Sequence, residues 1–209
     1  MKGGRVSRKG KIEQPAPLLI TALPAREDAI QVLCPFLAGL DPAVAFWLGG
    51  LAWHDANGAL LAALATPVPP GAQVYAGVFG VDPFRRDDDL FAALRRVGVP
   101  GVINLPTVSV MDGELGGILG SFQLGVEREI AFLLRARAAG FRIAGCVGSA
   151  ETADQLAQAG ADFLLAHGGP PQPGGGDPSR GAAERLRRRF AGGPPVVSVG
   201  ELLRNTRKG

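Results

Sequence analysis

The chain is organised around an alternation of apolar and polar segments between residues 74 and 113. Residues 74–79 form a short apolar run with β-branched positions, and residues 80–89 interrupt it with Gly, Pro and charged side chains. Apolar residues then recur at helical spacing through 90–97, and a second apolar run follows over 99–105. This order predicts a strand, a helix and a second strand, which together make a parallel βαβ unit.

The same alternation extends to both sides of this unit. Further apolar runs predict strands at residues 17–23, 43–49, 141–147, 161–166 and 195–200. Helical spacing predicts helices at residues 26–40, 59–65, 124–139, 149–160, 182–190 and from 201 onwards. Clusters of glycine and proline predict loops at residues 113–121 and 168–178.

About seven strands alternate with helices, so the predicted fold class is α/β with a parallel sheet. Two architectures fit this pattern, a (β/α) TIM-type barrel and an open doubly wound sheet. The first strand is not followed by the GxGxxG or GxxxxGK[ST] signature of nucleotide-binding open sheets. We therefore predict a TIM-type barrel, incomplete because it is one strand short of eight. Residues 17–204 would form this single domain, between a flexible basic leader at 1–16 and a basic tail at 205–209.

Positive charge is concentrated at the ends of the chain. Residues 1–13 have five Lys or Arg against Glu13, and residues 185–209 have seven against Glu201, whereas the body between them is net acidic. Aromatic residues do not interleave with these charges, so we expect solubilising tails and no nucleic-acid partner. The sequence has no secure membrane span and no secretory signal at its start, so we expect a cytoplasmic protein with no membrane partner.

The polar residues with candidate chemistry follow the ends of predicted strands. They are Asp82 and Arg85 after the first strand of the central unit, Asn104, Thr107 and Asp112 in or after its second, and His167 after residues 161–166. Ligands bind at the carboxyl ends of parallel strands, so the two loops of the central unit predict one site.

Each of these residues has a chemical and a structural interpretation. Asp82 could hold a metal ion or cap the next helix, and Arg85 could bind a carboxylate or phosphate or pair with Asp87–Asp89. Asn104 lies within an apolar strand and needs a polar partner, which a site or a barrel interior would provide. His167 could be an acid, a base, an anion binder or a metal ligand, or a hydrogen-bonded structural residue.

Separate segments of the chain fall in register with the motifs of one family. They are HDAN (54–57), AGVFGVDPFR (76–85), GVPGVINLPTVSVMDG (98–113), LGVEREI (124–130) and AETADQLAQAGADFLLAHGG (150–169). In the order and spacing of these motifs, over about residues 43–169, the chain resembles the phosphoenolpyruvate hydrolase-like TIM-barrel family. That family is related in fold to the phosphoenolpyruvate/pyruvate superfamily.

The resemblance implies a barrel-mouth site that acts on a C–O, P–O or C–C bond of a small oxo-acid or phosphorylated oxo-acid, with Mg²⁺ as the cofactor where one is used. The implied catalytic residues are Asp82, which would also bind the metal, Glu129 and His167. The implied substrate-binding residues are Arg85, Asn104, Thr107, Asp112, Asp55 and Asn57. Superfamily relatives are commonly oligomeric, so we expect a homo-oligomer.

Departures from the family pattern keep a second hypothesis open. The segment FWLGGLAW (46–53) stands where the family has a Tyr, Ser and Arg cluster, and an eighth strand is not predicted. Loss of this mouth chemistry would leave a catalytically silent barrel that binds a small acid or a protein partner as a regulator. The retained Asp82, Asn104, Asp112 and His167 favour an enzyme, so the sequence leaves both functions open.

Overall fold

The computed structural model describes residues 18–21, 29–37, 55–64, 67–111, 113–169 and 177–206. Seven strands form one parallel sheet in which each strand pairs with the next in the chain. They are β1 (Leu18–Thr21), β2 (Ile30–Leu33), β3 (Val74–Gly77), β4 (Gly101–Ile103), β5 (Arg142–Val147), β6 (Leu164–Ala166) and β7 (Val196–Ser198). A doubly wound sheet reverses its strand order at a switch point, whereas this sheet keeps one direction throughout. The fold is therefore an incomplete (β/α) barrel, as predicted.

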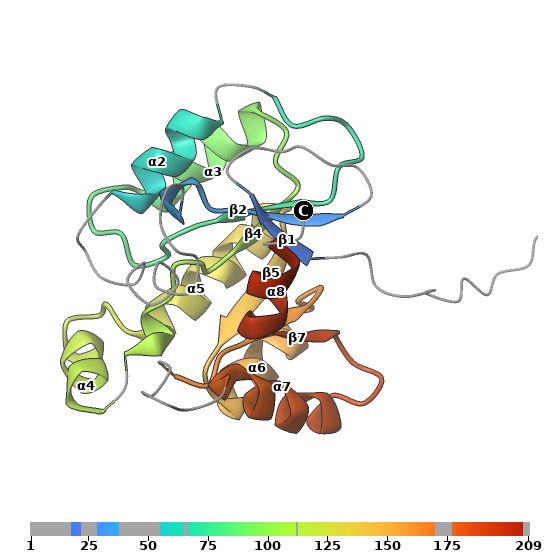
Figure 1. The fold of residues 1–209 in the computed structure, drawn as a ribbon. Helices are drawn as coiled ribbons and strands as arrows, with labels where there is room; N and C mark the ends of the chain where they lie inside the picture. The colour runs from blue at the N-terminus through green and yellow to red at the C-terminus, as the bar shows by residue number, and fades with distance from the viewer. Residues whose placement is uncertain are drawn as a thin grey trace, which may run out of the picture.

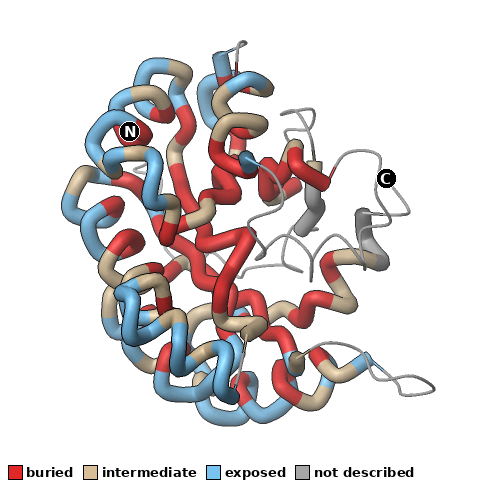
Figure 2. Tube along the Cα trace, turned by 90° about the vertical axis from the view of Figure 1, so that its left-hand side faces the viewer, coloured by how far each residue is buried: buried red, intermediate tan, exposed pale blue. Residues whose placement is uncertain are grey.

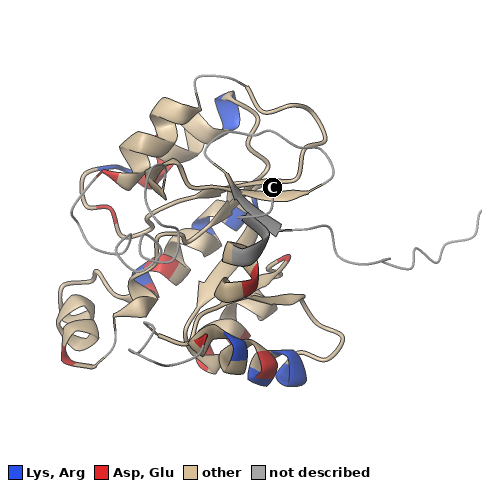
Figure 3. Ribbon diagram, in the orientation of Figure 1, with Lys and Arg blue, Asp and Glu red and all other residues tan. Residues whose placement is uncertain are grey.

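Helices follow the strands and enclose the sheet (Figure 1). They are α2 (Ala56–Ala63), α3 (Asp87–Arg96), α4 (Gly113–Ser121), α5 (Val126–Ala138), α6 (Ala150–Gln158), α7 (Pro178–Arg189) and α8 (Val199–Thr206), with short 3₁₀ helices at Pro35–Leu37 and Val108–Val110. Most charged residues lie on these helices and their loops, and the strands are largely uncharged (Figure 3). Among the described residues, no helix combines the length and hydropathy needed to cross a membrane.

Alternate residues along each strand enter two separate apolar layers. In β3, Val74 and Ala76 pack towards the helices, whereas Tyr75 enters an inner cluster. In β5, Ile143 packs outwards and Ala144 inwards. The strands form the buried centre of the molecule and the exposed positions lie on the surrounding helices (Figure 2). A period of two with both faces buried is what a sheet curved around a filled interior requires.

A helix covers the gap between the two ends of the sheet. α8 begins where β7 ends and packs against β1 (Figure 1). Val199 and Leu202 of this helix are buried in the inner cluster. α8 therefore lies where a further strand would close the barrel, and it protects strand edges that would otherwise invite pairing with another chain.

Two predicted elements are wrong. Residues 26–40 contain β2 and the 3₁₀ helix Pro35–Leu37 instead of one helix, because a short apolar run such as IQVL fits both periods. The glycines of residues 113–121 predict a loop, but this segment forms α4, in which Leu115, Ile118 and Leu119 keep helical spacing. The predicted strand at 43–49 lies outside the described residues, and β2 takes the second place in the sheet.

The other predicted strands and helices are confirmed, with shifts at their ends that local capping explains. Ser149 caps α6 by accepting a hydrogen bond from the backbone N–H of Thr152. α7 begins at Pro178, earlier than predicted, because Asp177 caps it and proline fits the first helical position. The acidic first turn and basic last turn of α3 match the helix dipole.

Candidate functional site

The carboxyl ends of the strands carry two groups of polar side chains. The first, the Asp82 cluster, consists of Asp55, Asn57, Asp82 and Arg85. The second, the His167 cluster, consists of Asn104, Thr107, Ser109, Glu129 and His167. The sequence predicts one site that mixes these residues, whereas the hydrogen bonds divide them into two groups. Asp112, another predicted site residue, lies outside the described residues.

The Asp82 cluster joins the loop after β3 to the first turn of α2. Arg85 donates to both carboxylate oxygens of Asp55, at 2.8 and 2.6 Å, and to Asp82 at 3.0 Å. Asp82 also accepts from the side chain of Asn57 at 2.9 Å and from the N–H of Phe84 at 2.8 Å. The predicted anion-binding guanidinium therefore already holds two carboxylates of its own chain.

The surroundings of Asp82 do not fit a resident Mg²⁺. Mg²⁺ requires near-octahedral oxygen ligands, but the neighbours of this carboxylate are an arginine and two N–H donors. Over the part of the chain that is described, no three His, Cys, Asp or Glu side chains are grouped as metal ligands. The magnesium site at Asp82 therefore stays a prediction without a ligand set to support it.

Glu129, at the first turn of α5, is fully buried. Its carboxylate accepts three hydrogen bonds, from Asn104 Nδ2 at 2.9 Å, Thr107 Oγ1 at 2.6 Å and the N–H of Val108 at 2.7 Å. Burial raises the pKa of Glu129 to about 7, although all three donors act to lower this pKa. A carboxyl group with a pKa near neutrality can take up or release a proton at physiological pH.

Asn104 connects this carboxyl to the sheet. Its Nδ2 also donates to the carbonyl of Cys146 at 3.0 Å, and its Oδ1 accepts from the N–H of Cys146 at 2.7 Å. These two bonds extend the β4–β5 pairing beyond its last backbone pair, Ile103 with Ala144. The polar residue in an apolar strand thus has its partners in β5 and Glu129. It is buried, and its amide group is held by Glu129 and by the backbone of Cys146.

Two hydroxyl groups link Glu129 to His167. Thr107 Oγ1 lies 2.7 Å from Ser109 Oγ, which in turn lies 2.8 Å from Nε2 of His167. Thr107 also caps the 3₁₀ helix Val108–Val110 by accepting from the N–H of Ser109 at 3.1 Å. Ser109 was not predicted as a site residue. Its only sequence signal is its place two residues after Thr107 in the loop that follows β4.

His167 directly follows β6 and is 2% exposed. Burial lowers the pKa of His167 to about 4, so its imidazole is neutral at pH 7. Its Nδ1 accepts from the N–H of Gly169 at 3.5 Å. Gly148 makes room for the ring, because a Cβ atom there would lie 2.7 Å from Cε1 of His167.

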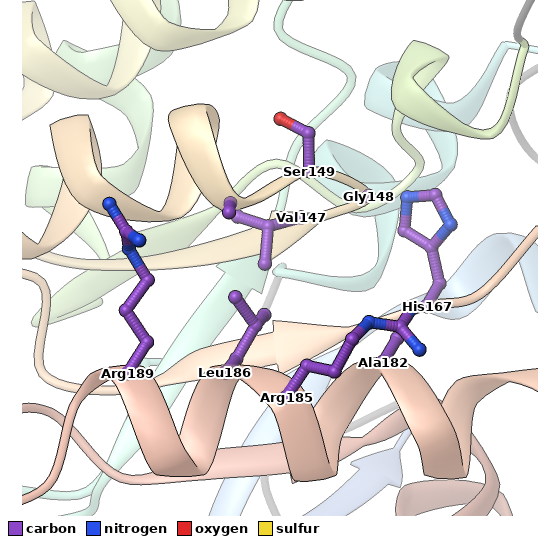
Figure 4. A pocket seen from close by; sticks show the side chains of 9 residues that line it. Val147, Gly148, Ser149, His167, Ala182, Arg185, Leu186 and Arg189 are labelled. Carbon is purple, nitrogen blue, oxygen red and sulfur yellow. The ribbon is translucent and has the colours of Figure 1, made fainter.

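Two cavities of about 290 Å³ each meet at His167, Gly148 and Ser149. The first lies between α6 and α7 and is also lined by Arg185 and Arg189, whose side chains extend from α7 (Figure 4). The second is also lined by residues of the Thr107 loop, of the starts of α5 and α6 and of the loop after β6, namely Ser109, Val110, Val126, Thr152, Gly168 and Gly169. The neutral imidazole of His167 therefore lies in the wall of both cavities.

Fold and site together define an incomplete (β/α) barrel with a buried, hydrogen-bonded cluster of polar and titratable side chains at the carboxyl ends of its strands. The chain belongs to the phosphoenolpyruvate hydrolase-like family, whose sequence pattern matches residues 43–187. The resemblance seen in the motifs is thereby confirmed.

Curated relatives have been described in bacteria and plants. The chain is 37% identical over 148 residues to the uncharacterized protein y4oT of Sinorhizobium fredii. This alignment covers 70% of this chain and 76% of that protein. The chain is also 36% identical over 123 residues to the ToMV resistance protein Tm-1 of Solanum lycopersicum. This alignment covers 58% of this chain but 16% of that protein. The tomato ToMV susceptible protein tm-1 gives the same values.

Among solved structures, a FabK mutant from Thermotoga maritima aligns with 87% of this chain and 52% of its own. The TM-score is 0.45 and the sequence identity is 14%.

Proposed function

We propose that the chain is an enzyme that binds a small oxo-acid or phosphorylated oxo-acid and that His167 exchanges a proton with this substrate. The observation that carries the proposal is the position of a buried, neutral imidazole in the wall of two cavities, with a hydrogen-bonded connection to Glu129. A neutral imidazole can accept a proton from a substrate group or a water molecule and later return it. Glu129 acts behind the imidazole and does not itself line either cavity.

Arg185 is our candidate for binding the anionic group of the substrate. It lines the cavity beside His167, together with the first residues of α6, where backbone N–H groups and the helix dipole favour an anion. Arg189 in the same cavity is already hydrogen-bonded to Asp154 at 2.7 Å through its Nε atom. The role that the sequence predicted for Arg85 thus passes, in this proposal, to a residue of α7.

Thermal unfolding and turnover assays with a panel of free and phosphorylated oxo-acids, phosphoenolpyruvate first, test this function with and without Mg²⁺. A ligand at about 100 times its dissociation constant stabilises the folded protein by roughly 2.7 kcal/mol. We expect His167→Gln to bind the active ligand without turning it over, and Arg185→Ala to lose binding. Arg188→Ala, a change on the same helix outside the cavity, is the matched control. An enzyme proposal does not survive if the folded wild-type protein turns over none of the panel.

The catalytically silent regulator is the second candidate. It is favoured by the Asp82 cluster, in which the predicted substrate-binding charges are paired with one another. This function predicts a ligand-induced shift of the unfolding temperature without turnover, and a shift of the same size in His167→Gln. The two candidates are therefore separated by the same set of assays.

A further inference from the structure

The hydrogen bonds between Glu129 and His167 fix the direction in which each hydroxyl group donates. An ionised Glu129 can only accept, so the Thr107 hydroxyl must donate to it. The oxygen of Thr107 is then the acceptor for Ser109, whose own oxygen must accept from Nε2 of His167. In this state the imidazole carries its hydrogen on Nε2, and Nδ1 is the acceptor that faces the N–H of Gly169.

Adding one proton to Glu129 reverses the direction in which the two hydroxyl groups donate. Asn104 and Val108 present only N–H donors to Glu129, so a protonated Glu129 must donate to Thr107. Thr107 then donates to Ser109, and Ser109 donates to Nε2 of His167. The neutral imidazole must now carry its hydrogen on Nδ1, which then no longer accepts the 3.5 Å hydrogen bond from the N–H of Gly169. The two states of the buried carboxyl therefore correspond to the two neutral tautomers of the ring.

We propose that Thr107 and Ser109 are positioning residues that relay one proton between His167 and Glu129, so that the protonation of Glu129 sets the tautomer of His167. When Nδ1 takes a proton, the Nε2 proton passes to Ser109 Oγ, the Ser109 proton to Thr107 Oγ1 and the Thr107 proton to Glu129 Oε2. The imidazolium and the carboxylate are neutralised together, and no further reactant is needed. This inference rests on the proposed function, in which His167 meets the substrate, and makes Glu129 the buried store for its proton.

The surroundings of His167 and Glu129 favour proton transfer from the imidazole to the carboxyl group. Burial raises the pKa of Glu129 to about 7 and lowers that of His167 to about 4, so an extra proton is more stable on the carboxyl. Arg185 and Arg189 are the charged residues that line the cavity on one side of the ring, and Arg189 is paired with Asp154. Cys146 of β5 is a titratable neighbour of Glu129, and burial holds the pKa of its thiol well above the ordinary value, so it stays neutral.

Nitrogen-15 NMR of the full chain labelled at histidine tests the relay without any substrate. The chain has two histidines, so a His54→Gln variant assigns the signals of His167. We expect the Nε2–H tautomer at high pH and the Nδ1–H tautomer at low pH, with a midpoint at about 7. An imidazolium should form only towards pH 4. A ring that keeps one tautomer from about one unit below this midpoint to one unit above it would overturn the relay.

Hydroxyl variants separate a relay from a purely structural contact. Ser109→Ala and Thr107→Val interrupt the chain at different links, and each should abolish the change of tautomer near pH 7 in a folded protein. Thr107→Ser keeps the hydroxyl group and should retain this change. If both interrupted variants keep the wild-type midpoint, the relay is wrong. The proposed function could still be correct in that case, whereas a normal change of tautomer without turnover would refute only the proposed function.

Discussion

Glu129→Gln gives the sharpest test of how this buried carboxyl is held. The carboxyl is fully buried, and its pKa rises from 4.5 to about 7 in the folded protein. A pKa difference of one unit corresponds to about 1.4 kcal/mol, so this shift is worth about 3 kcal/mol. A glutamine side chain does not titrate, and the variant therefore isolates the contribution of this one group to the pH dependence of stability.

The sign of the effect follows from proton release. Between pH 4.5 and about 7 the unfolded chain ionises Glu129 while the folded chain keeps it protonated, so unfolding releases a proton. The stabilisation is therefore complete below pH 4.5 and is lost as the pH rises through about 7. His167 has the opposite dependence, because its lowered pKa costs stability as the pH falls from 6.5 to about 4. Both proteins contain His167, so its contribution cancels in their difference.

Urea unfolding of the wild type and Glu129→Gln at a series of pH values measures this difference. Relative to the variant, we expect the wild type to lose about 3 kcal/mol of unfolding free energy between pH 4.5 and just above pH 7. Glu127→Gln, at an exposed position of the same helix, is the matched control. A difference that stays constant over this range would refute the reasoning. It would mean that the three hydrogen bonds to Glu129 outweigh the cost of burial.

Two further substitutions probe the site and the opposite end of the barrel. Gly148→Ala places a Cβ atom 2.7 Å from the His167 ring, so we expect a folded protein, destabilised by about 1–3 kcal/mol, with a displaced imidazole and reduced turnover. A crystal structure and turnover rate check this. Tyr75→Phe removes the 2.6 Å hydrogen bond to Asp162, which keeps Arg142 at 2.9 Å. We expect a loss of about 1–2 kcal/mol by urea unfolding, with unchanged turnover because these residues lie near the strand starts.

Local signals in the sequence account for most of the barrel. Strands β3 to β6 are short apolar runs between glycine or charged segments, and α3, α5 and α6 between them each bury one apolar face. β2 was missed because four apolar-rich residues do not distinguish a strand from a helical turn. α4 was missed because its glycines argue for a loop, and it buries no residue that could have marked an apolar face. The expected homo-oligomer and cytoplasmic location stay predictions.

The sequence indicated the residues of the site but could not show how they connect. The rule that ligands bind at the carboxyl ends of parallel strands identified four of them, Asp82, Asn104, Thr107 and His167, because it depends only on the order of residues along the chain. The partners are set by contacts between distant segments, such as Ser109 with His167, 58 residues apart. Arg85 was expected to pair with Asp87–Asp89 if it was structural, but it pairs with Asp55, 30 residues away. A single sequence contains no record of such pairings.

The two polar clusters differ in how their charges are compensated. In the Asp82 cluster, one arginine joins two carboxylates and ties α2 to the loop after β3, so the charges compensate one another. In the His167 cluster, three neutral donors hold a buried carboxyl, and its chain of hydroxyl groups ends at a ring beside two cavities. Mutual charge compensation stabilises a loop, whereas a carboxyl held by neutral donors keeps the freedom to change its protonation state. We therefore expect charge-removing changes in the Asp82 cluster to act mainly on stability, and changes in the His167 cluster to act mainly on proton transfer.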